Sequence, residues 1–205
     1  MIRSSRVVLF VLLAVLVAVP ATADPLSDAL AALRKEDYAT ALRLLRPLAD
    51  NGSAEAQFGL GMMYRYGEGV PRDDVEGAKW LLRAAEQGHD GAQFFVGSSY
   101  LLGRGVPEDP VEGAKWMRRA AEQGKAAAQN DLAMFYSAGV SRDYVQAYLW
   151  FHLASTRFDP SDTQRIKIAL FGRDEMASRM TPEQIAEAQR LAREWKPKPE
   201  KQGKK

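Results

Sequence analysis

The chain has 205 residues, of which 46% are hydrophobic and 26% are charged, as is usual for a soluble globular protein. It contains no cysteine, which excludes disulfide bonds, thiolate metal sites and a lipoprotein anchor. The formal net charge is only +2, and we expect no nucleic acid among its partners.

Residues 1–23 have the pattern of a secretory signal peptide. Two arginines precede an apolar run over residues 7–19, and residues 21–23 have the small-residue pattern of a cleavage site. A transmembrane anchor is the alternative, but it needs about 20 apolar residues, and Pro20 ends this run too early. We therefore predict export to the periplasm or beyond, without stable membrane insertion of the mature chain.

A sequence unit repeats after this segment with a period of 36 residues. The stretches VEGAKWLLRAAEQG and VEGAKWMRRAAEQG place Trp80 and Trp116 in the same slot. A third copy is two residues shorter, so that Trp150 follows Trp116 by 34 residues, and a weaker copy precedes all three. Such a period indicates units that stack on one another. Other positions that recur are Ala56, Ala92 and Ala128; Tyr64, Tyr100 and Tyr136; and Gly67, Gly103 and Gly139.

Each copy is predicted to form two helices. In the second copy Ser53 is suited to cap the first helix and Gly67 to end it. Asp73 or Asp74 is suited to cap the second helix, and Gly88 to end it. Because an isolated hairpin would leave its tryptophan exposed to solvent, we expect each indole to be buried against the next hairpin.

The motif A-Q-x-x-L-G-x-x-Y-x-x-G-x-G-V-P-x-D-x-x-x-A-x-x-W-x-x-x-A-A-E-Q-G closely resembles the Sel-one-like repeat, a relative of the tetratricopeptide repeat. It matches 56–88 and 92–124, although Gly77 and Gly113 stand where that family usually has alanine, and the third copy lacks the A-E-Q-G ending. The resemblance implies an all-α fold, an α/α solenoid (superhelix) of antiparallel helical hairpins. The predicted organisation is a signal peptide (1–23), four hairpins (24–52, 53–88, 89–124 and 125–156), C-terminal capping helices (157–195) and a disordered basic tail (196–205).

Two helices are expected in the C-terminal cap. Asp159 and Pro160 are suited to start a helix that runs to about Ser178, with a bend allowed at Gly172. Thr181 is suited to cap a last helix over 182–195. The tail beyond it holds five lysines and one glutamate. Its expected role is solubility, and weak contact with an anionic envelope surface is the alternative.

Residues suited to catalysis do not form a recognisable pattern. His89 and His152 are isolated and are interpreted as structural or solvated. The two G-x-G stretches are explained by helix ends, and Glu86 and Glu122 by solvated turns. We therefore expect no metal, no cofactor and no enzymatic activity.

The first helix of each hairpin is predicted to present a variable face to another protein or peptide. Its apolar side chains are either anchors for that partner or packing groups under the adjacent hairpin. The candidate residues on this concave face are Phe58, Met62, Tyr66, Phe94, Ser98, Leu102, Asn130 and Met134.

The function favoured by the resemblance is a non-enzymatic scaffold, or adaptor, for protein–protein interaction in the bacterial cell envelope. The alternatives are a cell-wall-active enzyme and a protein that binds an envelope polymer.

Overall fold

The computed structural model describes residues 24–138 and 142–198, which form ten helices and no strand. The predicted signal peptide (1–23) lies outside the described residues, as do Gly139 and the tail from residue 199 onward. Among the described helices, none is both long enough and apolar enough to cross a membrane.

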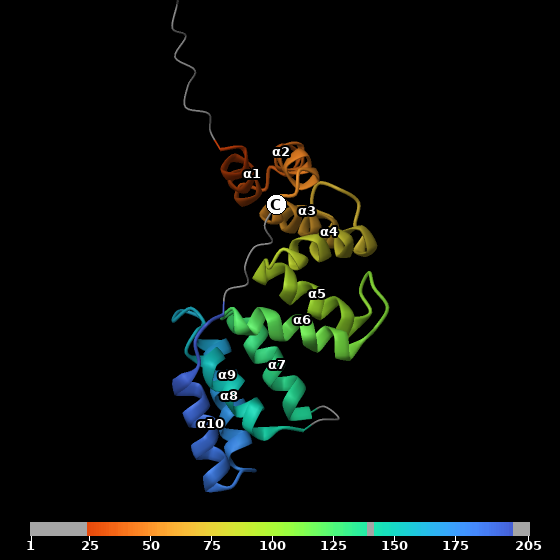
Figure 1. Ribbon diagram of the computed structural model, residues 1–205. Coiled ribbons are helices and arrows are strands. Elements are labelled where there is room, and N and C mark those ends of the chain that lie inside the picture. Colours follow the sequence, from red (N-terminus) through yellow and green to blue (C-terminus); the bar gives the residue numbers. More distant parts are fainter. Residues whose placement is uncertain (1–23, 139–141, 199–205) are drawn as a thin grey trace, which may run out of the picture.

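Eight of these helices form four antiparallel hairpins that follow one another in chain order from top to bottom of Figure 1. The pairs are α1 (Pro25–Arg34) with α2 (Tyr38–Asp50), α3 (Ala54–Tyr66) with α4 (Asp74–Glu86), α5 (Asp90–Leu102) with α6 (Pro110–Glu122), and α7 (Ala126–Ala138) with α8 (Tyr144–Ser155). Helices α9 (Thr163–Ala177) and α10 (Pro182–Glu194) pack on α8. The predicted all-α solenoid is confirmed.

The helix ends of the second hairpin follow from its capping residues. The Ser53 hydroxyl accepts the Ala56 N–H (3.3 Å), and Gly67 ends α3 with a left-handed φ of 75°. Asp73 is the cap of α4, since its carboxylate accepts the N–H groups of the two residues after Asp74 (3.0 and 2.9 Å). Gly88, with φ of 90°, then turns the chain toward α5.

The tryptophans are buried, but the predicted direction of their packing is wrong. Trp80 is 2% exposed and lies in one cluster with Leu45 of α2 and Leu60 of α3. Trp116 likewise lies in a cluster with Leu81 of α4. Trp80 and Trp116 therefore pack against the preceding hairpin, because small alanine side chains of that hairpin leave room for a large ring.

Glycine allows the two helices of a hairpin to approach closely. A Cβ atom at Gly97 would lie 3.0 Å from the carbonyl oxygen of Gly113, and one at Gly113 would lie 2.9 Å from that of Gly97. Gly61 and Gly77 are in the same relation in the hairpin before (3.1 and 3.0 Å). Backbone therefore faces backbone at these crossings.

The C-terminal cap differs from its prediction at one boundary. Helix α9 begins at Thr163 rather than at residue 160, because the Asp159 carboxylate accepts the N–H and hydroxyl of Ser161 (2.8 and 2.6 Å) and so stabilises a turn. The helix runs on through Gly172, where the Phe151 ring occupies the place of a side chain. The helix cap predicted at Thr181 is confirmed, and it forms a capping box with Gln184.

The described start of the tail lies against the third hairpin. The Lys198 N–H donates to the Glu122 carbonyl at the end of α6 (2.8 Å), and Pro197 lies beside Gly124. Just before it, Trp195 meets the Trp150 ring edge to face, with 6.3 Å between ring centroids.

Candidate binding face

The eight residues predicted to bind a partner lie on α3, α5 and α7, and we call the surface that they share the first-helix face. None of the eight is buried. Tyr66, Leu102 and Met134 are 52%, 69% and 53% exposed, and the other five are half-buried. Large apolar side chains that are exposed together on one surface often mark a site of protein–protein interaction.

Between α3 and α5 this face is closed by aromatic packing. The Phe95 ring lies 6.0 Å from that of Phe58 and 5.2 Å from that of Phe94. The Arg65 guanidinium lies 5.4 Å from the Phe95 ring centroid and donates to the Ser99 hydroxyl (2.9 Å). Burial lowers the pKa of Arg65. Phe58 and Phe94 are therefore partly covered by side chains of the protein itself.

His89 has a structural role on the same face. Its Nδ1 atom accepts the Ala92 N–H (3.1 Å) and so caps α5. Its Nε2 atom therefore carries the proton and donates to the Glu55 carboxylate (3.1 Å). The ring also stacks on Phe58, with 4.4 Å between centroids. The sequence interpretation missed Glu55 because that residue belongs to the hairpin before.

Between α5 and α7 the face opens into a cavity of about 350 Å³. Leu102 and Met134 form its exposed rim, and the buried Met117 lies beneath. Among the described residues that line it, one is charged, Asp131. The full lining consists of Ser98, Leu101, Leu102, Met117, Asp131, Met134 and Phe135.

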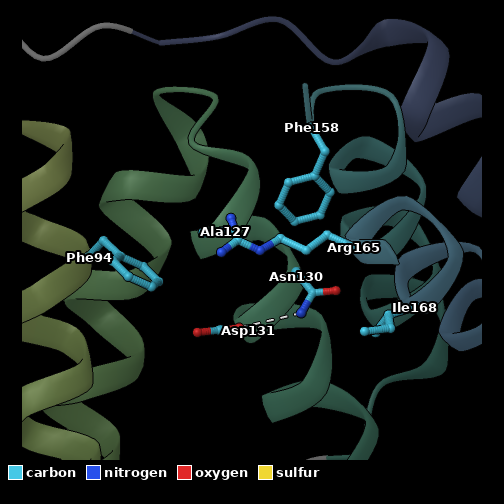
Figure 2. Close-up of a pocket in the computed structure, with 7 residues that line it drawn as sticks. All are labelled: Phe94, Ala127, Asn130, Asp131, Phe158, Arg165 and Ile168. Carbon is cyan, nitrogen blue, oxygen red and sulfur yellow. Dashed lines mark hydrogen bonds between the residues drawn. The ribbon is translucent and has the colours of Figure 1, made fainter. Parts of the chain in front are cut away.

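Asp131 also borders a second cavity of about 210 Å³, between α5, α7 and α9 (Figure 2). There the Arg165 side chain extends from α9 toward Phe94, with Asn130 and Asp131 beneath it on α7. Five of the eight predicted residues line one or other of these two cavities: Phe94, Ser98, Leu102, Asn130 and Met134. Phe58 and Met62 border a third, between α1 and α3.

The carboxyl group of Asp131 has a raised pKa. Burial raises its pKa, and the Asn130 amide and the charge of Arg165 offset only part of this effect. The Asn130 amide donates to it at 3.4 Å, whereas Arg165 forms its ion pair with Asp162 (3.4 Å). The side-chain amide oxygen of Asn130 (Oδ1) is buried and has no hydrogen-bond partner among the described residues.

Asp131 is not among the residues predicted from the sequence, although the alignment of the repeats contains a signal for it. The equivalent positions of the two preceding copies are Gly59, which is buried, and Phe95, which is half-buried. A carboxylate at a repeat position that is otherwise occupied by glycine and phenylalanine is a departure from the pattern.

The remaining histidine lies elsewhere, at a cavity between α8 and α10 that Arg173 and Arg193 also line. Burial, together with the charges of Arg173 and Arg157, lowers the pKa of His152. Within residues 24–138 and 142–198, no group of three or more His, Asp or Glu side chains is placed to hold a metal ion.

Comparisons with known proteins agree with this architecture. The Sel1 repeat family model matches residues 31–53, 54–89, 91–125 and 126–157. No curated protein sequence matches the chain.

Solved structures with this fold are also similar. A protective antigen present in uropathogenic Escherichia coli strains, which displays an SLR fold, is 34% identical with a TM-score of 0.66, over 76% of this chain and 32% of its own. A Sel1 repeat protein from Oxalobacter formigenes is 30% identical with a TM-score of 0.65, over 71% of this chain and 59% of its own. The chain therefore spans less than two thirds of either relative.

Proposed function

This chain belongs to the Sel1 repeat family, whose repeats generally mediate protein–protein interaction, and on that premise we propose that it is a non-enzymatic scaffold of the bacterial cell envelope. The observation that carries the proposal is the open cavity between α5 and α7, with Leu102 and Met134 exposed on its rim. A partner that covers these side chains would gain about 25 cal/mol for each Å² of apolar surface removed from water.

Placement in the envelope rests on the sequence of residues 1–23. Cell fractionation of the full chain and of a chain without residues 2–23 tests this part. We expect the full chain in the periplasm or the medium and the shortened chain in the cytoplasm.

The binding role is tested by photo-crosslinking in cells from two exposed apolar positions. Leu102 lies on the first-helix face, whereas Val75 is 53% exposed in the first turn of the second helix α4. A photoreactive residue at 102 should give a discrete crosslinked protein, and the additional change Met134→Ser should remove it. Position 75 is the matched control. Identical products from both positions, or none from 102, would contradict the proposal.

A further inference from the structure

We propose that the cavity between α5 and α7 binds a lysine or arginine side chain of a partner protein, with an apolar residue of the same segment seated between Leu102 and Met134. This inference rests on the proposed function, because it names the chemistry of the partner at that site. It follows from a comparison of two equivalent grooves within the same chain.

The groove between α3 and α5, which aromatic packing closes, is filled by a cationic side chain of the protein itself. Arg65 of α3 lies over the Phe95 ring of α5 and donates to the Ser99 hydroxyl at 2.9 Å. Arg65 is only 5% exposed, so a guanidinium fits in the space between two successive first helices. Its aliphatic stem and its charged end are both accommodated there.

The groove between α5 and α7 has the opposite arrangement. One repeat later, Leu101 stands in place of Arg65 and Asp131 in place of Phe95. The second groove has thus lost the internal cation and gained an anion. Both Leu101 and Asp131 line the open cavity.

Asp131 has no ion-pair partner within 4.0 Å among the described residues. Arg165, the cation whose charge acts on it, forms its ion pair with Asp162 and has a side chain that is 65% exposed. A partly buried carboxylate is stabilised most by a positive charge that contacts it directly. The apolar walls favour the hydrocarbon stem of such a side chain, so the cavity matches a long cationic residue better than a small cation.

The test uses short acetylated peptide amides in which one lysine is flanked by leucine and methionine, and the same peptides with norleucine in place of lysine. Binding to the full chain is measured by fluorescence anisotropy. We expect the lysine peptides to bind at least tenfold more tightly than the norleucine peptides. Asp131→Asn should abolish this difference, whereas Glu86→Gln, which removes an exposed carboxylate of α4, should preserve it.

A second variant places the missing cation inside the groove. Leu101→Arg copies the residue that the preceding repeat has at this position, and it should compete with the lysine peptides and weaken their binding at least tenfold. Circular dichroism and urea unfolding of each variant show whether the fold is kept, and Asp131→Asn alone is decisive if Leu101→Arg does not fold.

Three outcomes would overturn the inference: no lysine peptide binds, the lysine preference survives Asp131→Asn, or norleucine peptides bind as tightly as lysine peptides. If norleucine peptides bind equally well and still depend on Met134, the inference fails while the proposed function stands. If position 102 also gives no crosslinked protein in cells, both fail.

Discussion

At the scale of single residues, a ladder of glutamines ties each hairpin to the one before. The buried side chains of Gln57, Gln93 and Gln129 each donate to a carbonyl near the end of the preceding second helix, that of Ala49, Ala85 or Ala121 (3.0, 3.2 and 3.0 Å). Each of these carbonyls also accepts the N–H of the glycine that follows its helix, that of Gly52, Gly88 or Gly124 (3.0 Å each), so the glutamine supplies a second hydrogen bond to the same oxygen and joins it to the next hairpin.

The ladder is incomplete at its last step. Gln87 and Gln123 donate to the side-chain oxygens of Gln57 and Gln93 (2.7 and 2.8 Å). The third copy has Arg157 at this place, and Arg157 lies over the Trp195 ring instead (4.2 Å). The side-chain oxygen of Gln129 is therefore buried without a partner among the described residues.

We expect Gln93→Leu to lower the free energy of unfolding by about 1–3 kcal/mol, because it removes two buried side-chain hydrogen bonds, one to the Ala85 carbonyl and one from the Gln123 amide. Gln129→Leu should cost clearly less, because it removes an oxygen that is already unpaired. Urea unfolding of the two variants checks the difference. Equal losses would show that the second hydrogen bond contributes nothing.

The other prediction at this scale concerns pH. The folded-state pKa of Asp131 is raised from 3.8, so the folded chain holds this proton more tightly than the unfolded chain does. Ionisation of Asp131 therefore destabilises the fold as the pH rises from 3.8 through the raised pKa. Asp131→Asn should unfold at higher urea concentration than the parent at pH 7, and the difference should vanish below pH 3.8. A less stable variant at pH 7 would mean that the carboxylate is held by a favourable contact.

At the scale of helices, close crossings decide which glycines tolerate a side chain. A Cβ atom at Gly97 would lie 3.0 and 3.1 Å from backbone atoms of α6, which cannot yield. At Gly59 the nearest atom is the end of the Leu45 side chain (3.2 Å), which can move. Both glycines are inside helices, where alanine is intrinsically favoured by about 1 kcal/mol.

We therefore expect Gly97→Ala to destabilise the chain by about 1–3 kcal/mol through overpacking, and Gly59→Ala to be neutral or slightly stabilising. Thermal unfolding followed by circular dichroism compares them directly. If Gly97→Ala were as well tolerated as Gly59→Ala, α5 and α6 would have to be able to separate without cost.

Most of the helices could be predicted because their determinants are local. Ser53, Gly67, Asp73 and Thr181 act within a few residues of themselves, so capping patterns located these helix ends. The direction in which Trp80 packs could not be read, because both neighbouring hairpins offer alanines at equivalent positions. Asp131 was missed for a related reason: its character comes from residues of two other helices.

At the scale of the whole molecule, the main contacts of each described hairpin are with its neighbours in the stack, so the two ends of the stack are covered by different elements. The first hairpin covers one side of α3 and the Trp80 ring. At the other end, α8 is apolar around most of its circumference, and α9 and α10 both pack on it. The C-terminal cap therefore covers an apolar helix with two helices, whereas the first hairpin covers one side of α3.

This asymmetry predicts opposite results for two truncations. A chain that starts at Ser53 should stay monomeric and unfold cooperatively at lower urea concentration, because it uncovers the Trp80 ring and only one side of α3, with Leu60 and Met63. A chain that ends at Thr156 should aggregate, because Phe151, which packs on Gly172 of α9, and Trp150, which meets Trp195, both lose their cover. Size-exclusion chromatography and urea unfolding distinguish the two. A monomeric, cooperatively folded chain ending at Thr156 would mean that the repeats bury α8 without the cap.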